Sequence, residues 1–146
     1  WMAHSGAGNT LMQIFTHMKT PQNFIILSGD VHYSFVYDIK LHFKKSSPNI
    51  WQVTCSGIKN EFPKTLLAFF DWLNRWLYHP YSPLNWFTKR RAMKIKPRKP
   101  TSLSHRHSLS QSSLGYLVFD EDGAPTHISV LTADGEDVEF ISRQDE

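Results

Sequence analysis

The sequence FIILSGDVHYSFVYDIKLHF, residues 24–43, decides the fold. Its first four residues are apolar without interruption, which is typical of a fully buried strand. Residues 33–43 instead alternate between apolar and polar side chains, with Val36 as the exception, and this period of two predicts a half-buried strand. Between the two patterns, Gly29 gives the backbone the freedom for a tight turn, so we expect the first strand to end there.

A helix precedes this stretch and another strand follows it. Apolar residues recur at helical spacing over residues 11–18, after a Gly-rich turn at residues 5–8 and a cap at Asn9 or Thr10. Residues 50–55 predict a strand that pairs antiparallel with the alternating one. A helix followed by a buried strand and a hairpin predicts an α/β or a layered α+β fold, and we favour α/β.

The rest of the chain divides into a helix, a polar segment and a β-meander. Residues 65–78 predict a helix with one broad apolar face. Residues 101–113 are rich in Ser and His and are typical of a loop. The closing strands, separated by Gly-containing turns, are expected at 114–119, 126–131 and 138–141.

Composition excludes several classes of protein. The chain has 146 residues, of which 40% are hydrophobic, so it can bury a core and is not disordered throughout. Its single Cys excludes a disulfide framework and a Cys-rich zinc module. No apolar run reaches the length of a membrane span, and no signal peptide is visible. Because the first residue is Trp1, we expect the sequence to begin inside a longer protein, with any export signal preceding it.

Charge is distributed unevenly along the chain. The net charge is +3, but residues 1–100 carry 14 basic and 4 acidic side chains, whereas residues 101–146 carry 2 basic and 9 acidic ones. Seven of the sixteen positive charges lie within residues 89–99. The basic excess is therefore local, and the overall balance says little about nucleic-acid binding.

Asp30 and His32 are the main candidates for chemistry. They project near the carboxyl end of a strand, where ligands bind in α/β sheets. A carboxylate and an imidazole two residues apart suit a metal ion. The same spacing also fits an Asp that caps local amides beside a partly buried His.

Three segments resemble PhoD-like phosphatases, which belong to the calcineurin-like metallophosphoesterase superfamily. Ser28-Gly29-Asp30-Val31-His32-Tyr33 resembles the family's late metal-binding motif, and Trp1-Met2-Ala3-His4 with the following helix resembles the stretch before it. Gln52-Val53-Thr54-Cys55-Ser56-Gly57-Ile58 resembles the strand and Ser-Gly loop after it, and Gly-Tyr-Leu-Val-Phe-Asp at 115–120 fits the closing meander. The resemblance covers residues 1–60 well, is thin over 61–113 and returns at 114–141.

The resemblance implies that residues 1–146 form the C-terminal part of one layered α/β/β/α sandwich that ends in an antiparallel β-meander. It implies a binuclear metal centre, of Fe, Ca, Mn or Zn, that activates water to hydrolyse phosphomonoesters or phosphodiesters. By match, His32 is a metal ligand, and Asp30 binds metal directly or orients the site.

The sequence departs from the superfamily pattern in two respects. Asp30 stands where many members have the first His of a Gly-His-x-His motif. An early Asp-x-His, a Gly-Asp-x-x-Asp and a Gly-Asn-His block are absent. One or two ligands cannot hold two metals, so we expect this piece to be inactive without the N-terminal part of its own chain.

Four further residues are candidates for a phosphate-binding or pocket-lining role. His4 precedes the first helix, and Ser56, Gly57 and Asn60 follow a strand end, where backbone amides could contact a phosphate. The alternatives are a surface histidine and an ordinary turn.

Residues 66–99 support a rival, non-catalytic hypothesis. Aromatic side chains followed by a basic run are typical of a module that binds an anionic membrane surface or a partner. Single-stranded nucleic acid is a less favoured ligand for the same composition. A helix packed on the sheet and a solvated basic loop would also explain the pattern.

Overall fold

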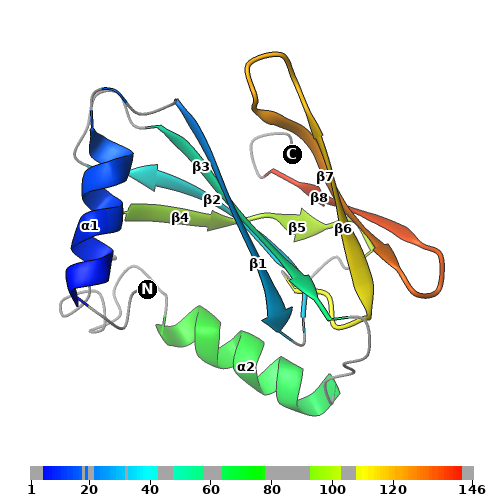
Figure 1. Ribbon diagram of the computed structural model, residues 1–146. Coiled ribbons are helices and arrows are strands. Elements are labelled where there is room, and N and C mark those ends of the chain that lie inside the picture. Colours follow the sequence, from blue (N-terminus) through cyan, green and yellow to red (C-terminus); the bar gives the residue numbers. More distant parts are fainter. Residues whose placement is uncertain are drawn as a thin grey trace.

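The computed structural model defines two helices and eight strands within the residues it describes (Figure 1). Those residues are 5–17, 19, 22–31, 33–42, 48–57, 64–77, 93–102 and 108–142. In chain order the elements are α1 (Ser5–Thr16), β1 (Asn23–Val31), β2 (Phe35–Leu41), β3 (Asn49–Ser56), α2 (Lys64–Leu77), β4 (Met93–Pro97), β5 (Lys99–Pro100), β6 (Ser113–Phe119), β7 (Pro125–Thr132) and β8 (Asp137–Ile141).

The described strands form two four-stranded sheets. The first sheet has the order β1-β3-β2-β4, with β1 parallel to β3 and the other pairs antiparallel. The second sheet has the order β5-β8-β7-β6 and is antiparallel. The predicted α/β class is therefore confirmed, with strands predominating.

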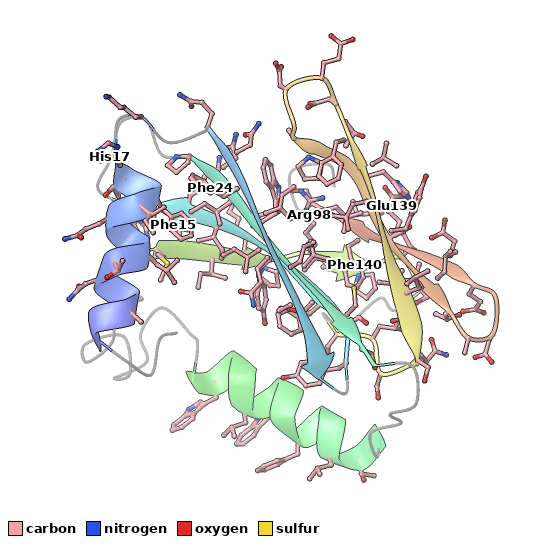
Figure 2. The ribbon with its side chains drawn as sticks, viewed as in Figure 1. Phe15, His17, Phe24, Arg98, Glu139 and Phe140 are labelled. Atoms are coloured by element: carbon pink, nitrogen blue, oxygen red, sulfur yellow. The ribbon has the colours of Figure 1, made fainter. Side chains whose placement is uncertain are left out.

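The two faces of the first sheet bury different partners. One face packs against the second sheet around Val36, Val53, Ile128 and Phe140, each 1% exposed. The opposite face packs against α1, where the Phe15 ring lies 4.9 Å from that of Phe24 in an edge-to-face pair (Figure 2). The alternation of β2 explains this arrangement, because successive side chains point to opposite faces. Val36, an apolar residue where the alternation calls for a polar one, is the β2 residue that packs against the second sheet.

Three local predictions differ from the structure. The helix begins at Ser5, so the expected turn at residues 5–8 and the expected cap are wrong. Thr10 lies inside α1, where its hydroxyl donates to the Gly6 carbonyl at 3.1 Å, a bond that satisfies a helical Thr. The strand β1 runs on to Val31 instead of turning at Gly29. It is also not fully buried, because it is an edge strand of the described sheet and Leu27 is 68% exposed.

The other expected elements are confirmed. The helix predicted at 65–78 is α2, and the antiparallel pair of β2 and β3 matches the expected hairpin. The three strands of the meander are β6, β7 and β8. Their turns contain Gly123 and Gly135 with φ of 75° and 84°, backbone angles that favour glycine.

The two sheets approach each other closely where β3 faces β6. A β-carbon added to Gly115 would overlap the Cys55 sulfur. Burial raises the pKa of the Cys55 thiol, an effect that the nearby Gly115 backbone N–H partly offsets. Glycine is required at position 115 because the sulfur occupies the space of a side chain.

We expect Gly115→Ala to destabilise the protein by about 1–3 kcal/mol, because the new methyl group overpacks the interface between the sheets. Urea unfolding of Gly115→Ala, Cys55→Ala and the double variant tests this. The double variant should recover much of the loss, because removing the sulfur makes room. Equal losses in Gly115→Ala and the double variant would contradict the steric explanation.

Candidate functional site

The carboxyl ends of β1 and β3 lie side by side at one edge of the first sheet, hereafter the carboxyl edge. The two strands are parallel, and Ser28 and Val31 on β1 pair with Thr54 and Ser56 on β3. The sequence-predicted motif on β1 and the Ser-Gly loop after β3 therefore meet at the same edge. Ligands of α/β proteins bind at such edges.

The pairing of β1 with β3 shifts by one residue within the motif. The four residues Ser28–Val31 of β1 lie opposite the three residues Thr54–Ser56 of β3, and Gly29 and Asp30 lie in this bulge. A bulge bends a strand and redirects its side chains, and bulges are frequent beside active sites. Gly29 has open space around its α-carbon, so neither packing nor a left-handed φ requires glycine there.

A buried hydroxyl cluster supports the end of β3. The Ser34 hydroxyl accepts a hydrogen bond from the Ser56 backbone N–H at 2.9 Å and lies 2.8 Å from the Ser113 hydroxyl. The Ser34 backbone also exchanges two hydrogen bonds with Leu109, at 2.7 and 2.9 Å. Ser34, which is 0% exposed, thus connects the carboxyl edge to the segment leading into β6.

The structure describes only part of the predicted site. Ser56 is 5% exposed and its amide is bonded within the protein, so this arrangement leaves that N–H unavailable to a phosphate. Gly57 follows it, partly exposed, and Asp30 is described only in its backbone, within β1. The remaining candidates lie outside the described residues: His4, His32 and Asn60.

The side chains of Asp30 and His32, on which the metal hypothesis depends, are therefore known from the sequence and not from the structure. Within the part of the chain that the structure describes, no three His, Cys, Asp or Glu side chains gather closely enough to hold a metal ion. The observation that fits a metal is the bulge, because it lies in β1 opposite the end of β3 and directly before His32 in the sequence.

Part of the basic run at residues 89–99 forms strands, where a solvated loop was one expectation. Residues 93–97 form β4, which pairs with β2, and Arg98 leads directly into β5. Pro97 is compatible with this strand because β4 is an edge strand of the described sheet. Its alternation Lys94-x-Lys96-x-Arg98 was a sequence signal for a strand, but Pro97 within this stretch and Pro100 just after it argued against one. Residues 78–92 lie outside the described residues.

The helix α2 carries a row of exposed apolar side chains. Phe69, Trp72 and Trp76 are 52%, 61% and 62% exposed, and Leu66 is 43% exposed. Figure 1 shows α2 apart from both sheets, on the side toward which β1 and β3 point. Leu66, Phe69 and Trp76, which belong to the apolar face predicted for this helix, are therefore not buried against a sheet, whereas the side chains of Phe70 and Leu77 on that face lie outside the described ones. None of the helices that the structure describes is long and apolar enough to cross a membrane.

Comparison with known proteins adds no assignment: no family model, no curated protein and no solved structure matches this chain. The fold and the residues on it therefore carry the functional argument by themselves.

We expect Ser34→Ala to destabilise the chain by about 1–3 kcal/mol, because it leaves the Ser56 N–H and the Ser113 hydroxyl buried without their partner. Urea unfolding measures the loss, and amide hydrogen exchange at Ser56 should become faster. Ser102→Ala, at an exposed position, is the matched control. Equal stability of the two variants, with unchanged exchange at Ser56, would contradict this role for Ser34.

Proposed function

We propose that this chain is the C-terminal part of a metal-dependent phosphoesterase related to the PhoD-like phosphatases. The observation that carries the proposal is the parallel pairing of β1 with β3, with a bulge at Gly29 and Asp30. This pairing brings the described parts of two segments that resemble the family, residues 28–31 and 52–57, to one edge of the sheet. Segments that build one site must lie close together in space. The family resemblance of two segments does not by itself require them to do so.

The finer architecture belongs to the same proposal. The described residues provide α1, the first sheet and the second sheet, in agreement with three layers of an α/β/β/α sandwich. In the described residues neither helix covers the outer face of the second sheet, where Leu114 is 65% exposed. The second helical layer and the upstream metal motifs would come from elsewhere in the parent protein.

In this proposal His32 is a metal ligand, and Asp30 either binds metal or orients the site. Bound metals supply a Lewis acid and a water of lowered pKa for attack on a phosphate ester. The chain's own contribution is to hold these residues at the end of β1. The bulge redirects the strand there, and the Ser34 cluster fixes the neighbouring end of β3.

We expect His32→Ala in the full-length parent to abolish phosphoesterase activity and to lower the metal content from about two ions per chain. Elemental analysis measures the metal, and hydrolysis of a phosphomonoester and a phosphodiester measures activity. The matched control is His17→Ala, an exposed histidine beyond the end of α1. Full metal content and activity in His32→Ala would refute the site.

A second candidate function, binding to an anionic membrane surface through segment 66–99, is favoured by the exposed apolar face of α2. Aromatic side chains on an amphipathic helix enter the interfacial region of a bilayer, and neighbouring cations bind anionic headgroups. The described basic strand β4 and the sequence of residues 89–92 supply those cations. This function does not require a metal.

We expect Trp72→Ala/Trp76→Ala to reduce co-sedimentation with phosphatidylserine-containing vesicles several-fold, because the double variant removes two exposed indoles from the bound face. Leu114→Ala/Leu131→Ala, which removes exposed apolar side chains from the second sheet, is the matched control. Binding that is absent at low salt, or equal in both variants, would exclude α2 as a membrane-binding helix.

A further inference from the structure

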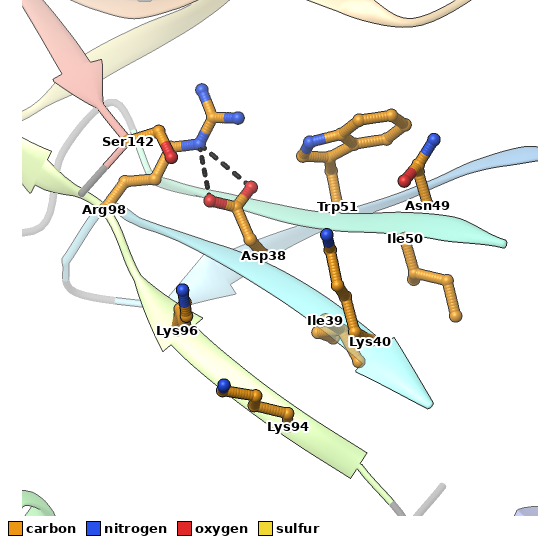
Figure 3. Close-up of a pocket in the computed structure, with 10 residues that line it drawn as sticks. All are labelled: Asp38, Ile39, Lys40, Asn49, Ile50, Trp51, Lys94, Lys96, Arg98 and Ser142. Atoms are coloured by element: carbon orange, nitrogen blue, oxygen red, sulfur yellow. Dashed lines mark hydrogen bonds and ion pairs between the residues drawn. The ribbon is translucent and has the colours of Figure 1, made fainter. Parts of the chain in front are cut away.

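A hollow of about 180 Å³ lies at the opposite end of the first sheet from the carboxyl edge (Figure 3). Trp51 lies near the start of β3, whereas Ser56 ends that strand, a separation on the order of 15 Å. The hollow opens on the face that carries Val36 and Val53, where the two sheets diverge. We call it the basic groove. The charged and aromatic side chains that line it are Asp38, Lys40, Trp51, Lys94, Lys96 and Arg98.

The basic groove concentrates positive charge. Among the described residues that line it, four are cationic and Asp38 is the single acid, which gives a net charge of +3. Asp38 is already engaged, because both of its carboxylate oxygens accept from Arg98 Nε at 3.0 and 3.1 Å. The ammonium groups of Lys40, Lys94 and Lys96 form no ion pair or hydrogen bond with another described residue.

The strand register forces two of these lysines together. Lys40 on β2 lies directly opposite Lys94 on β4, and Asp38 lies opposite Lys96. Like charges directly opposite each other on one face of an antiparallel pair destabilise a sheet. A multivalent anion bound between the lysines would convert this repulsion into attraction.

Arg98 and Trp51 form the remaining walls of the basic groove. Arg98 is held in place by Asp38 and also donates from Nη1 to the Phe140 carbonyl at 3.5 Å, so its guanidinium is oriented before any ligand arrives. Figure 3 shows Lys40 extending from β2 toward the Trp51 indole, which forms the wall on β3. Oriented cations beside an indole suit a phosphorylated compound, with or without an aromatic base.

We propose that the basic groove binds a pyrophosphate group, as inorganic pyrophosphate or as part of a nucleoside diphosphate. Two linked phosphates carry enough negative charge to balance the net +3 of the groove and can contact cations on both β2 and β4. This site is distinct from the carboxyl edge and does not depend on a metal there.

Isothermal titration calorimetry on the full-length parent, with sodium pyrophosphate and with ADP, tests the proposal. Lys40→Gln/Lys94→Gln should weaken binding about tenfold or more, because it removes two charged contacts. Its melting temperature should not fall, because the substitution also removes a repulsive pair. Retention of cooperative melting separates lost binding from lost folding.

Two control variants locate the binding event. Lys19→Gln removes an exposed lysine just after α1 and should bind pyrophosphate with unchanged affinity. His32→Ala removes the proposed metal ligand, and the loss caused by Lys40→Gln/Lys94→Gln should persist in that background. Unchanged affinity in the double lysine variant in the His32→Ala background, or an equal loss in Lys19→Gln, would overturn the proposal. Tighter binding of ADP than of pyrophosphate would support a nucleotide in contact with Trp51, and equal binding would support pyrophosphate alone. Tighter binding of a single-stranded oligonucleotide than of either would overturn a small-ligand site.

Discussion

Arg98 joins the two sheets, and the rest of the structure depends on this junction. Its backbone N–H donates to the Val36 carbonyl of β2 at 2.9 Å, and the next residue, Lys99, pairs with Ile141 of β8. Its side chain connects the same two sheets, through Asp38 on β2 and the Phe140 carbonyl on β8. One extended segment, β4 and β5, therefore belongs to both sheets (Figure 2). The apolar core around Val36 is enclosed because this segment holds the sheets face to face.

The two ends of the first sheet carry different kinds of polar side chain. At the carboxyl edge, small hydroxyl side chains are buried and satisfy one another, which gives a rigid frame for the end of β1. At the other end, the ammonium groups of Lys40, Lys94 and Lys96 have no described partner, and they line an open hollow beside the Arg98–Asp38 pair. The apolar centre of the sheet lies between the two ends, so a ligand at one end need not disturb the other.

The sequence predicted most elements because their patterns were local. The helix at 64–77 and the three meander strands follow from apolar periodicity and turn glycines. The sequence also predicted a strand end close to Asp30 and His32, and β1 ends at Val31, after Asp30 instead of before it. Three features were not predicted: the continuation of β1 through Gly29, the burial of Ser34, and the strand at Met93–Pro97. Each depends on a partner strand or segment distant in sequence, which local propensity does not contain.

By itself, then, the sequence determined the α/β class and the identity of most strands, and it indicated the candidate site residues. Only the tertiary structure decided which of those residues meet. It put Ser56 beside Val31 and Lys40 opposite Lys94, and it left the aromatic face of α2 exposed. The physical reason is that strand register and sheet packing are set by hydrogen bonds and burial between distant segments. A one-residue difference in pairing, such as the bulge at Gly29 and Asp30, changes the direction of a side chain without changing its identity.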